Sequence, residues 1–176
     1  MAAGWIEDKK RVDKFEPLIK QILGLHLILT ADIQRDEREA TDLMVLELRP
    51  FRVGCRIRSF DYLNRYPDEF TIRSDRPSGF PSELTKIVDG WGDYLFYGFA
   101  DAAGLSLASW FIGDLHIFRG TFSRNLFLRQ PQFLQRNGDE SSRFFAWPLN
   151  QFPAAFVIAR KIYKETNGEA NNSTKT

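Results

Sequence analysis

Residues 93–101 (DYLFYGFAD) form an almost unbroken aromatic and aliphatic run between two aspartates. A short run of this kind is typical of a β-strand that is buried on both faces. Such a strand needs cover on each side of its sheet, and helices supply that cover in α/β proteins. Because 176 residues can bury one substantial core, we expect a single α/β domain over residues 1–166. The polar tail at 167–176 is expected to be disordered.

The other elements are predicted from hydrophobic period and from turn residues. In chain order we expect a helix at 12–29, extended segments at 41–48, 52–59 and 69–74, a helix at 82–91, the strand at 93–101, a strand and a helix within 105–120, and a late helix at 153–165. Pro17 indicates that the first helix becomes regular near that residue. Ser82 is the expected N-cap of the second helix, and Trp91 ends its apolar stripe. The three extended segments predict an antiparallel meander, and the aromatic stretch at 121–156 predicts a packed C-terminal cap.

Net charge, cysteine content and the lack of a long apolar run limit the ligands and the cellular location that we expect. Lysine and arginine total 24 and aspartate and glutamate total 23, so any phosphate binding must come from local clustering. The single cysteine, Cys55, excludes an internal disulfide and indicates a reducing compartment. It lies on the apolar side of its segment and is expected to be an inert, buried thiol. No apolar run reaches about 18 residues and the N-terminal residues lack a signal-peptide core, so we expect a cytoplasmic protein without membrane contact.

Three arginines are placed to share one sheet surface. In the segment VGCRIRS the period of two sends Cys55 to one face, and Arg56 and Arg58 to the other. The segment at 69–74 repeats the pattern, with Glu69 and Arg73 on one face. Such a cluster is suited to gripping nucleic-acid phosphates. It is equally typical of an exposed sheet face on which arginines pair with acids across strands, and the sequence leaves both interpretations open.

The segment at 41–59 (TDLMVLELRPFRVGCRIRS), together with the order helix, three strands, helix, strand, resembles a known nuclease core. The family is the PD-(D/E)XK superfamily, and the resemblance is closest to its Holliday-junction-resolvase type. In that family an acid opens the second strand, and the third strand carries an acid and a lysine two residues apart. Asp42 stands at the position of the first acid, whereas Arg56 and Arg58 stand where the second acid and the lysine would be. The resemblance implies a restriction-endonuclease-like core, with a central mixed sheet that has helices on both faces.

The resemblance also implies a site for hydrolysis of phosphodiesters with magnesium or manganese, in which Asp42 binds the metal. In some members a carboxylate from the following helix replaces a missing strand acid. Glu83 is placed for that role, Lys86 for the catalytic cation, and Glu69 is the other candidate metal ligand. The alternatives are structural: Asp42 as an aspartate that starts a strand or caps a turn, and Glu83 as a first-turn acid that pairs with Lys86.

The leading functional hypothesis is a restriction-endonuclease-like protein that engages nucleic acid and cleaves it with magnesium or manganese. The alternative is an inactive version of the same fold, favoured by the arginine at the second acid position. It would act as a binding or assembly protein, and the aromatic C-terminal region would contact a second copy or a partner protein. The chain also resembles phage or prophage proteins in general character, and a structural phage component is a third interpretation.

Overall fold

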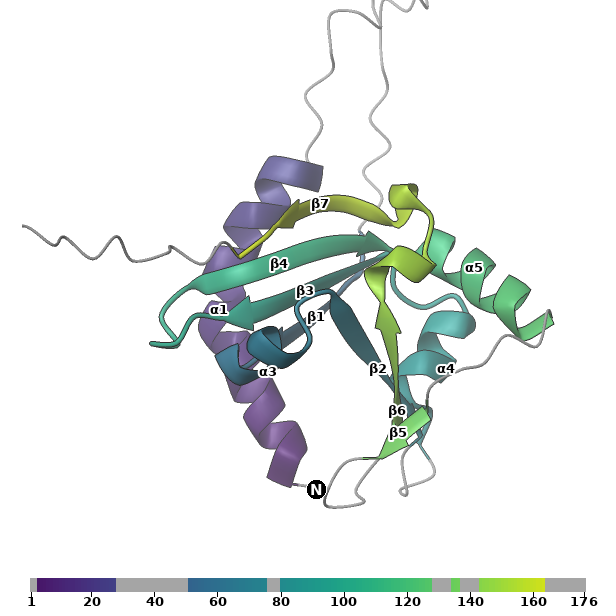
Figure 1. Ribbon diagram of the computed structural model, residues 1–176, viewed down its shortest axis with the longest axis horizontal. Coiled ribbons are helices and arrows are strands. Elements are labelled where there is room, and N and C mark those ends of the chain that lie inside the picture. Colours follow the sequence, from purple (N-terminus) through teal and green to yellow (C-terminus); the bar gives the residue numbers. More distant parts are fainter. Residues whose placement is uncertain (1–2, 28–50, 76–79, 128–133, 137–142, 164–176) are drawn as a thin grey trace, which may run out of the picture.

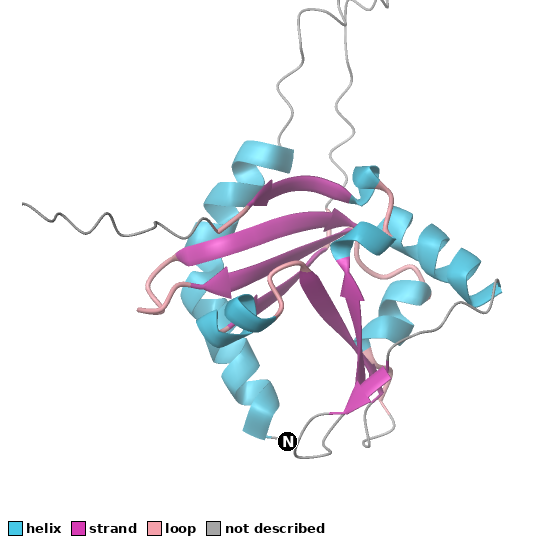
Figure 2. Cartoon of the chain, viewed as in Figure 1, coloured by secondary structure: helices cyan, strands magenta, loops and turns pink. Residues whose placement is uncertain are grey.

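The computed structural model describes residues 3–27, 51–75, 80–127, 134–136 and 143–163 (Figure 1). Within these ranges the chain forms a four-stranded sheet and a three-stranded sheet. Helices pack around these strands (Figure 2). The four-stranded sheet contains both parallel and antiparallel pairs. The predicted α/β class with a mixed sheet is therefore confirmed.

The larger sheet has the strand order β1-β3-β4-β7. Its strands are β1 (Val53–Arg58), β3 (Tyr94–Ala100), β4 (Leu107–Asp114) and β7 (Val157–Lys161). β1 runs parallel to β3, and the other two pairs are antiparallel. β1 pairs with no second strand within the described residues, so it forms one edge of this sheet.

The predicted meander is wrong for the two of its segments that the structure describes. β2 (Glu69–Asp75) pairs with β6 (Arg143–Pro148) in the second sheet, which β5 (Leu134–Arg136) completes. A short helix, α3 (Phe60–Arg65), separates β1 from β2 and buries Leu63 in the core. The connection at 59–68 is thus longer than the roughly two to five residues of a hairpin loop. The first predicted strand, at 41–48, lies outside the described residues.

One face of the larger sheet is covered by α1 (Ala3–Leu27). This helix packs Phe15, Ile19 and Ile22 against residues of β1, β3 and β4. It begins well before Pro17, which lies inside it, contrary to the predicted start. A proline inside a helix removes one backbone hydrogen bond, but the packing of the apolar stripe on both sides of Pro17 keeps the helix continuous here.

The opposite face is covered by α4 (Glu83–Val88), α5 (Leu115–Phe127) and the second sheet. The centre of this core is Phe70, which is fully buried. Six aromatic rings lie with their centroids 5.5 to 6.3 Å from that of Phe70: Tyr97, Phe111, Phe118, Trp147, Phe152 and Phe156. Aromatic packing of this density supplies much of the burial that holds the two sheets together.

The C-terminal region differs from its prediction in two ways. The described residues of the predicted late helix at 153–165, which end at 163, do not form an α-helix; a 3₁₀ turn at Ala154–Phe156 leads directly into β7. Pairing with β4 outweighs helical propensity there, because Val157 and Ile158 are β-branched and favour strands. Trp147, Phe152 and Phe156 are buried in the chain's own core, so these aromatic side chains are not available to a partner.

Candidate functional site

The two arginines of β1 do share a face, as the sequence predicted. Ile57, between them, is buried under α1 on the opposite face. The parallel register places Arg56 beside Tyr97 of β3 and Arg58 beside Phe99. The face is therefore polar at the edge strand and aromatic one strand further in.

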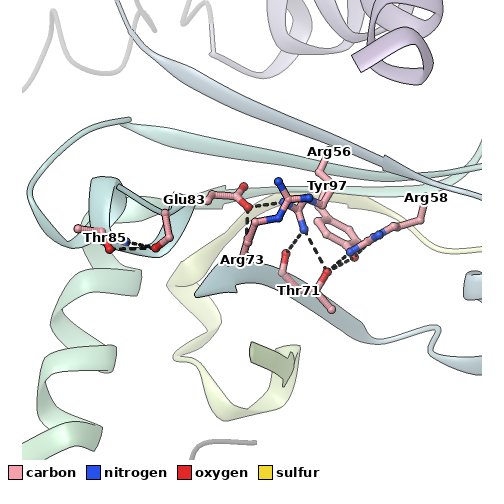
Figure 3. A network of polar contacts seen from close by, with 8 residues as sticks. Arg56, Arg58, Thr71, Arg73, Glu83, Thr85 and Tyr97 are labelled. Carbon is pink, nitrogen blue, oxygen red and sulfur yellow. Dashed lines mark hydrogen bonds and ion pairs between the residues drawn. The ribbon is translucent and has the colours of Figure 1, made fainter. Parts of the chain in front are cut away.

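Arg56 and Arg58 belong to a network of hydrogen bonds that joins β1, β2, β3 and α4 (Figure 3). Arg56 Nη1 donates to the carbonyl oxygen of Thr71 at 3.2 Å, and Arg56 Nη2 forms an ion pair with Glu83 Oε2. Arg58 Nε donates to the hydroxyl of Tyr97 at 3.2 Å, and Arg58 Nη2 donates to Thr71 Oγ1. Thr71 thus connects the two arginines, and each guanidinium group is held in a fixed orientation.

Glu83 is positioned by the start of α4. Ser82 caps this helix as predicted: its hydroxyl accepts a hydrogen bond from the Thr85 amide at 3.1 Å. Glu83, in the first turn, points back toward β1 and β2, and its Oε2 also accepts from the Arg73 amide at 3.2 Å. The side chains of Arg56 and Glu83 are 17% and 27% exposed, so this is a partly buried pair. The carboxylate thus pairs with Arg56 across the fold, rather than with Lys86 on its own helix as the structural alternative had it.

A cavity of about 400 Å³ opens beside this network, between α1, β1, β2 and α4. Four basic side chains and one acidic side chain line it: Lys9, Arg56, Arg73, Lys86 and Glu83. The remaining walls are mainly apolar, and Trp91 contributes a ring that is 63% exposed. An excess of positive charge in a concave site attracts anions, so the arrangement suits a phosphate-bearing ligand.

The predicted metal ligands are not gathered at this cavity. Glu69 lines a different cavity of about 420 Å³, together with Arg160, Lys161 and Tyr163, whereas Glu83 lines the basic one. Asp42 lies outside the described residues. Among the residues that the structure describes, no group of three or more histidine, cysteine, aspartate or glutamate side chains could hold a metal ion. The metal site therefore stays a prediction.

Several residues of the site were missed in the sequence. Trp91 was assigned to the apolar stripe of the helix, but α4 ends at Val88 and Gly90 follows with a φ of 90°, which turns the chain so that Trp91 reaches the surface. Lys9 comes from α1, far away in the sequence, and no local signal connects it to β1. The hydroxyl of Tyr97 was hidden in a strand whose other residues are apolar, although a buried tyrosine usually finds a hydrogen-bond partner.

Cys55 takes no part in this network. It lies on the α1 side of β1, where burial and, to a lesser extent, the Glu16 carboxylate raise its pKa to about 11. A thiol with such a pKa is almost entirely protonated at neutral pH and is a poor nucleophile. This agrees with the inert thiol expected from the sequence.

No protein-family model matches the sequence, and comparisons with curated proteins and with solved structures found no match. The resemblance to the PD-(D/E)XK superfamily accordingly remains a prediction. Each helix in the described part of the chain is too short or too polar to span a membrane.

Proposed function

We propose that this protein binds nucleic acid, with the basic cavity between α1, β1 and α4 as the site of phosphate contact. The observation that carries the proposal is the lining of that cavity, where four cations face one carboxylate. Electrostatic attraction to phosphates supplies most of the affinity of proteins that bind nucleic acid without sequence preference. A nearly neutral chain can use it only where its charges are clustered, as they are here.

Arg56 and the two lysines of the cavity are expected to contribute to phosphate binding in different ways. The guanidinium of Arg56 is engaged by Glu83 and Thr71, so it contributes charge and holds the cavity wall in place. Lys9 and Lys86 are exposed at the cavity, and each carries its charge at the end of a long side chain with several rotatable bonds. The two lysines are therefore expected to make the more adjustable phosphate contacts.

The test compares lysines on and off the cavity. Binding of the full chain to a labelled single strand of about 20 nucleotides is measured by fluorescence anisotropy between about 50 and 200 mM salt. Lys9→Ala and Lys86→Ala should each flatten the slope of log K against log salt by about 0.7, the value for one phosphate contact on a single strand. Lys10→Ala is the matched control, because Lys10 is the exposed neighbour of Lys9 on α1 but does not line the cavity.

Two results would contradict the proposal. One is the absence of binding at the lowest salt concentration. The other is a salt slope in Lys9→Ala and Lys86→Ala that equals the slope of Lys10→Ala. Either result would mean that the basic side chains of the cavity make no phosphate contacts.

Catalysis is a second candidate function, supported by the position of Glu83 and Lys86 on the wall of one cavity. Asp42 and Glu83 would hold magnesium or manganese, which supplies Lewis-acid stabilisation of the phosphate when bound. The two bonds that Glu83 Oε2 accepts do not saturate a carboxylate, which has about four lone-pair positions. Lys86 would orient the attacking water or steady the leaving oxygen.

Cleavage assays separate this candidate from an inactive binding protein. Asp42→Asn and Lys86→Met should abolish metal-dependent cleavage while the protein stays folded. Asp42→Asn should bind nucleic acid as before, and Lys86→Met should bind it with the loss of one phosphate contact. The same variants, purified identically, are the control for contaminating nuclease. If the unaltered protein cleaves no single-stranded, duplex, branched or RNA substrate with either metal, it is a binding protein without nuclease activity.

A further inference from the structure

We infer that the nucleic acid bound here is single-stranded, and that its bases stack on Trp91 and on Tyr62 at the two ends of one strip of cationic side chains. The inference rests on the proposed function and adds to it the strandedness of the ligand. We use the term cationic strip for the surface formed by Arg52, Arg56, Arg58, Arg65, Lys86, Trp91 and Tyr62.

The first stacking position is Trp91, at the rim of the basic cavity. A single exposed tryptophan carries little meaning by itself, since folded proteins expose much apolar surface. Here the guanidinium carbon of Arg52 lies 5.7 Å from the centroid of the Trp91 ring. Arg52 is in turn fixed by a bond from its Nη2 to the Gly90 carbonyl oxygen at 3.3 Å and by an ion pair with Asp93 at 3.4 Å. The chain thus holds an aromatic face and a cation together at the entrance of the basic cavity.

The second stacking position is on α3, directly after β1. Tyr62 and Tyr66 are 37% and 42% exposed. The guanidinium carbons of Arg58 and Arg65 both lie 5.1 Å from the centroid of the Tyr62 ring, and that of Arg65 lies 5.9 Å from the centroid of Tyr66. Interleaved arginine and aromatic side chains are the arrangement on which unpaired bases stack in proteins that bind single strands.

The polar network of Arg56, Arg58 and Thr71 connects the two stacking positions. Arg56 lines the cavity beside Trp91, Arg58 lies against Tyr62, and both arginines donate to Thr71. The chain from Arg52 to Arg58 spans at most about 20 Å when extended. A stretch of several nucleotides could therefore place its phosphates along β1 and a base at each end.

Stacking on Trp91 and Tyr62 requires unpaired bases, which a single strand offers and a duplex does not. In a duplex each base is paired and stacked between its neighbours, so its ring face is not available to a protein side chain. Unpaired bases expose that face, and stacking on an aromatic ring then adds to the phosphate contacts without regard to sequence. An exposed ring at the basic cavity and a second one at the far end of the cationic strip consequently favour a single strand over a duplex.

A protein partner is the competing ligand, because tryptophan, tyrosine and arginine are also enriched in protein interfaces. Lysine is depleted in such interfaces, whereas Lys9 and Lys86 line the cavity here. Glu83 and Asp93 are each already paired with an arginine of the strip. The charge of this surface therefore favours a polyanion.

The experiment uses the full chain and three probes of equal length: an oligo-dT strand, an abasic strand with the same phosphates, and a blunt duplex. Oligo-dT should bind more tightly than the abasic strand, by roughly 5- to 150-fold for each stacked base. Trp91→Ala and Tyr62→Leu should each reduce that ratio, and neither should change the affinity for the abasic strand. Leu105→Ala is the matched control, because Leu105 is exposed in the turn that follows β3, whereas Trp91 precedes that strand.

A second measurement does not depend on truncation. Oligo-dT should quench part of the fluorescence of the four tryptophans, and Trp91→Phe should remove that quenching while it keeps an aromatic ring and most of the affinity.

The possible outcomes separate this inference from the proposed function. Equal affinity for oligo-dT and the abasic strand, or a duplex that binds as tightly as oligo-dT, would overturn the inference and leave phosphate binding intact. Unchanged oligo-dT affinity in both Trp91→Ala and Tyr62→Leu would also overturn it and would assign these rings to a protein contact. Failure of all three probes to bind at low salt would overturn the inference and the proposed function together.

Discussion

The edge strand β1 and the inner strand β3 carry opposite chemistry on the same face of one sheet. On β1 this face presents Arg56 and Arg58, and on β3 it presents the buried rings of Tyr97 and Phe99. The difference arises from what covers each strand. β3 lies beneath the aromatic core, whereas β1 has no second strand beside it in the described part of the chain and borders an open cavity. Alternation therefore shows which residues share a face, but the position of the strand in the sheet determines what that face can do.

The largest expected loss of stability comes from a change in the aromatic core that covers β3. Phe70→Ala removes the ring that six other aromatic rings surround, so we expect a loss of about 3 to 5 kcal/mol in the free energy of unfolding. Urea denaturation followed by circular dichroism measures it. Leu105→Ala, at an exposed position, should change the stability by no more than about 0.5 kcal/mol. Similar losses in both variants would mean that the rings around Phe70 do not form a tight core.

The next largest loss of stability is expected from a change in the polar network of β1. Arg56→Met leaves the partly buried carboxylate of Glu83 without its ion pair, so we expect a loss of about 1.5 to 3 kcal/mol. Arg124→Met is the control, because Arg124 is an exposed arginine of α5. A double-mutant cycle with Glu83→Gln should give an interaction energy of about 0.5 to 3 kcal/mol. If the two changes are simply additive, the two side chains act independently and the network is not a cooperative unit.

A smaller loss of stability is expected from a change at the N-cap of α4, the helix that positions Glu83 next to β1. Ser82→Ala removes the hydroxyl that caps the helix and should lower the stability by about 1 kcal/mol. The same change at Ser123, an exposed position within α5, should be nearly neutral. Thermal unfolding of both variants provides the comparison, and equal melting temperatures would show that the cap does not contribute.

An effect that appears only at alkaline pH concerns the other face of β1. Because the pKa of Cys55 is raised from about 9 to about 11, its thiol favours folding below pH 9, and this contribution is lost as the pH rises from 9 through 11. Relative to Cys55→Ala, the unaltered protein should therefore lose additional stability above pH 9. Urea denaturation of both proteins at pH 7 and at pH 10 measures the difference. A difference that is the same at both pH values would show that the thiol ionises as readily in the folded protein as in the unfolded chain.

Much of the local structure could be predicted because its signals lie within a few residues. The apolar run at 93–101 predicted β3, Ser82 predicted the start of α4, and the alternation around Ile57 predicted that Arg56 and Arg58 share a face. These features depend on the period of a strand or on the cap of a helix. Tertiary contacts change them little.

The errors arose where the partner of a segment is distant in the sequence. The alternation in β2 is the same whether it pairs with β1 or with β6, so the sequence did not reveal its partner. The apolar run at 154–159 fits a helix or a strand, and pairing with β4 decides between them. At the site, the ion pair of Glu83 with Arg56 and the contribution of Lys9 to the cavity depend on how α4 and α1 pack against β1, which no local pattern encodes.

The polar network and the aromatic core also differ in how far apart their parts lie along the chain. Arg58 and Thr71 are separated by 13 positions and Arg56 and Glu83 by 27, whereas Phe70 must meet Trp147, Phe152 and Phe156 from the other half of the protein. Loop-closure entropy grows with separation, and folding slows as native contacts become less local. We therefore expect docking of β6 onto β2 to limit the folding rate. A nascent chain would complete the sequence of the cationic strip well before it has the residues needed to close the core.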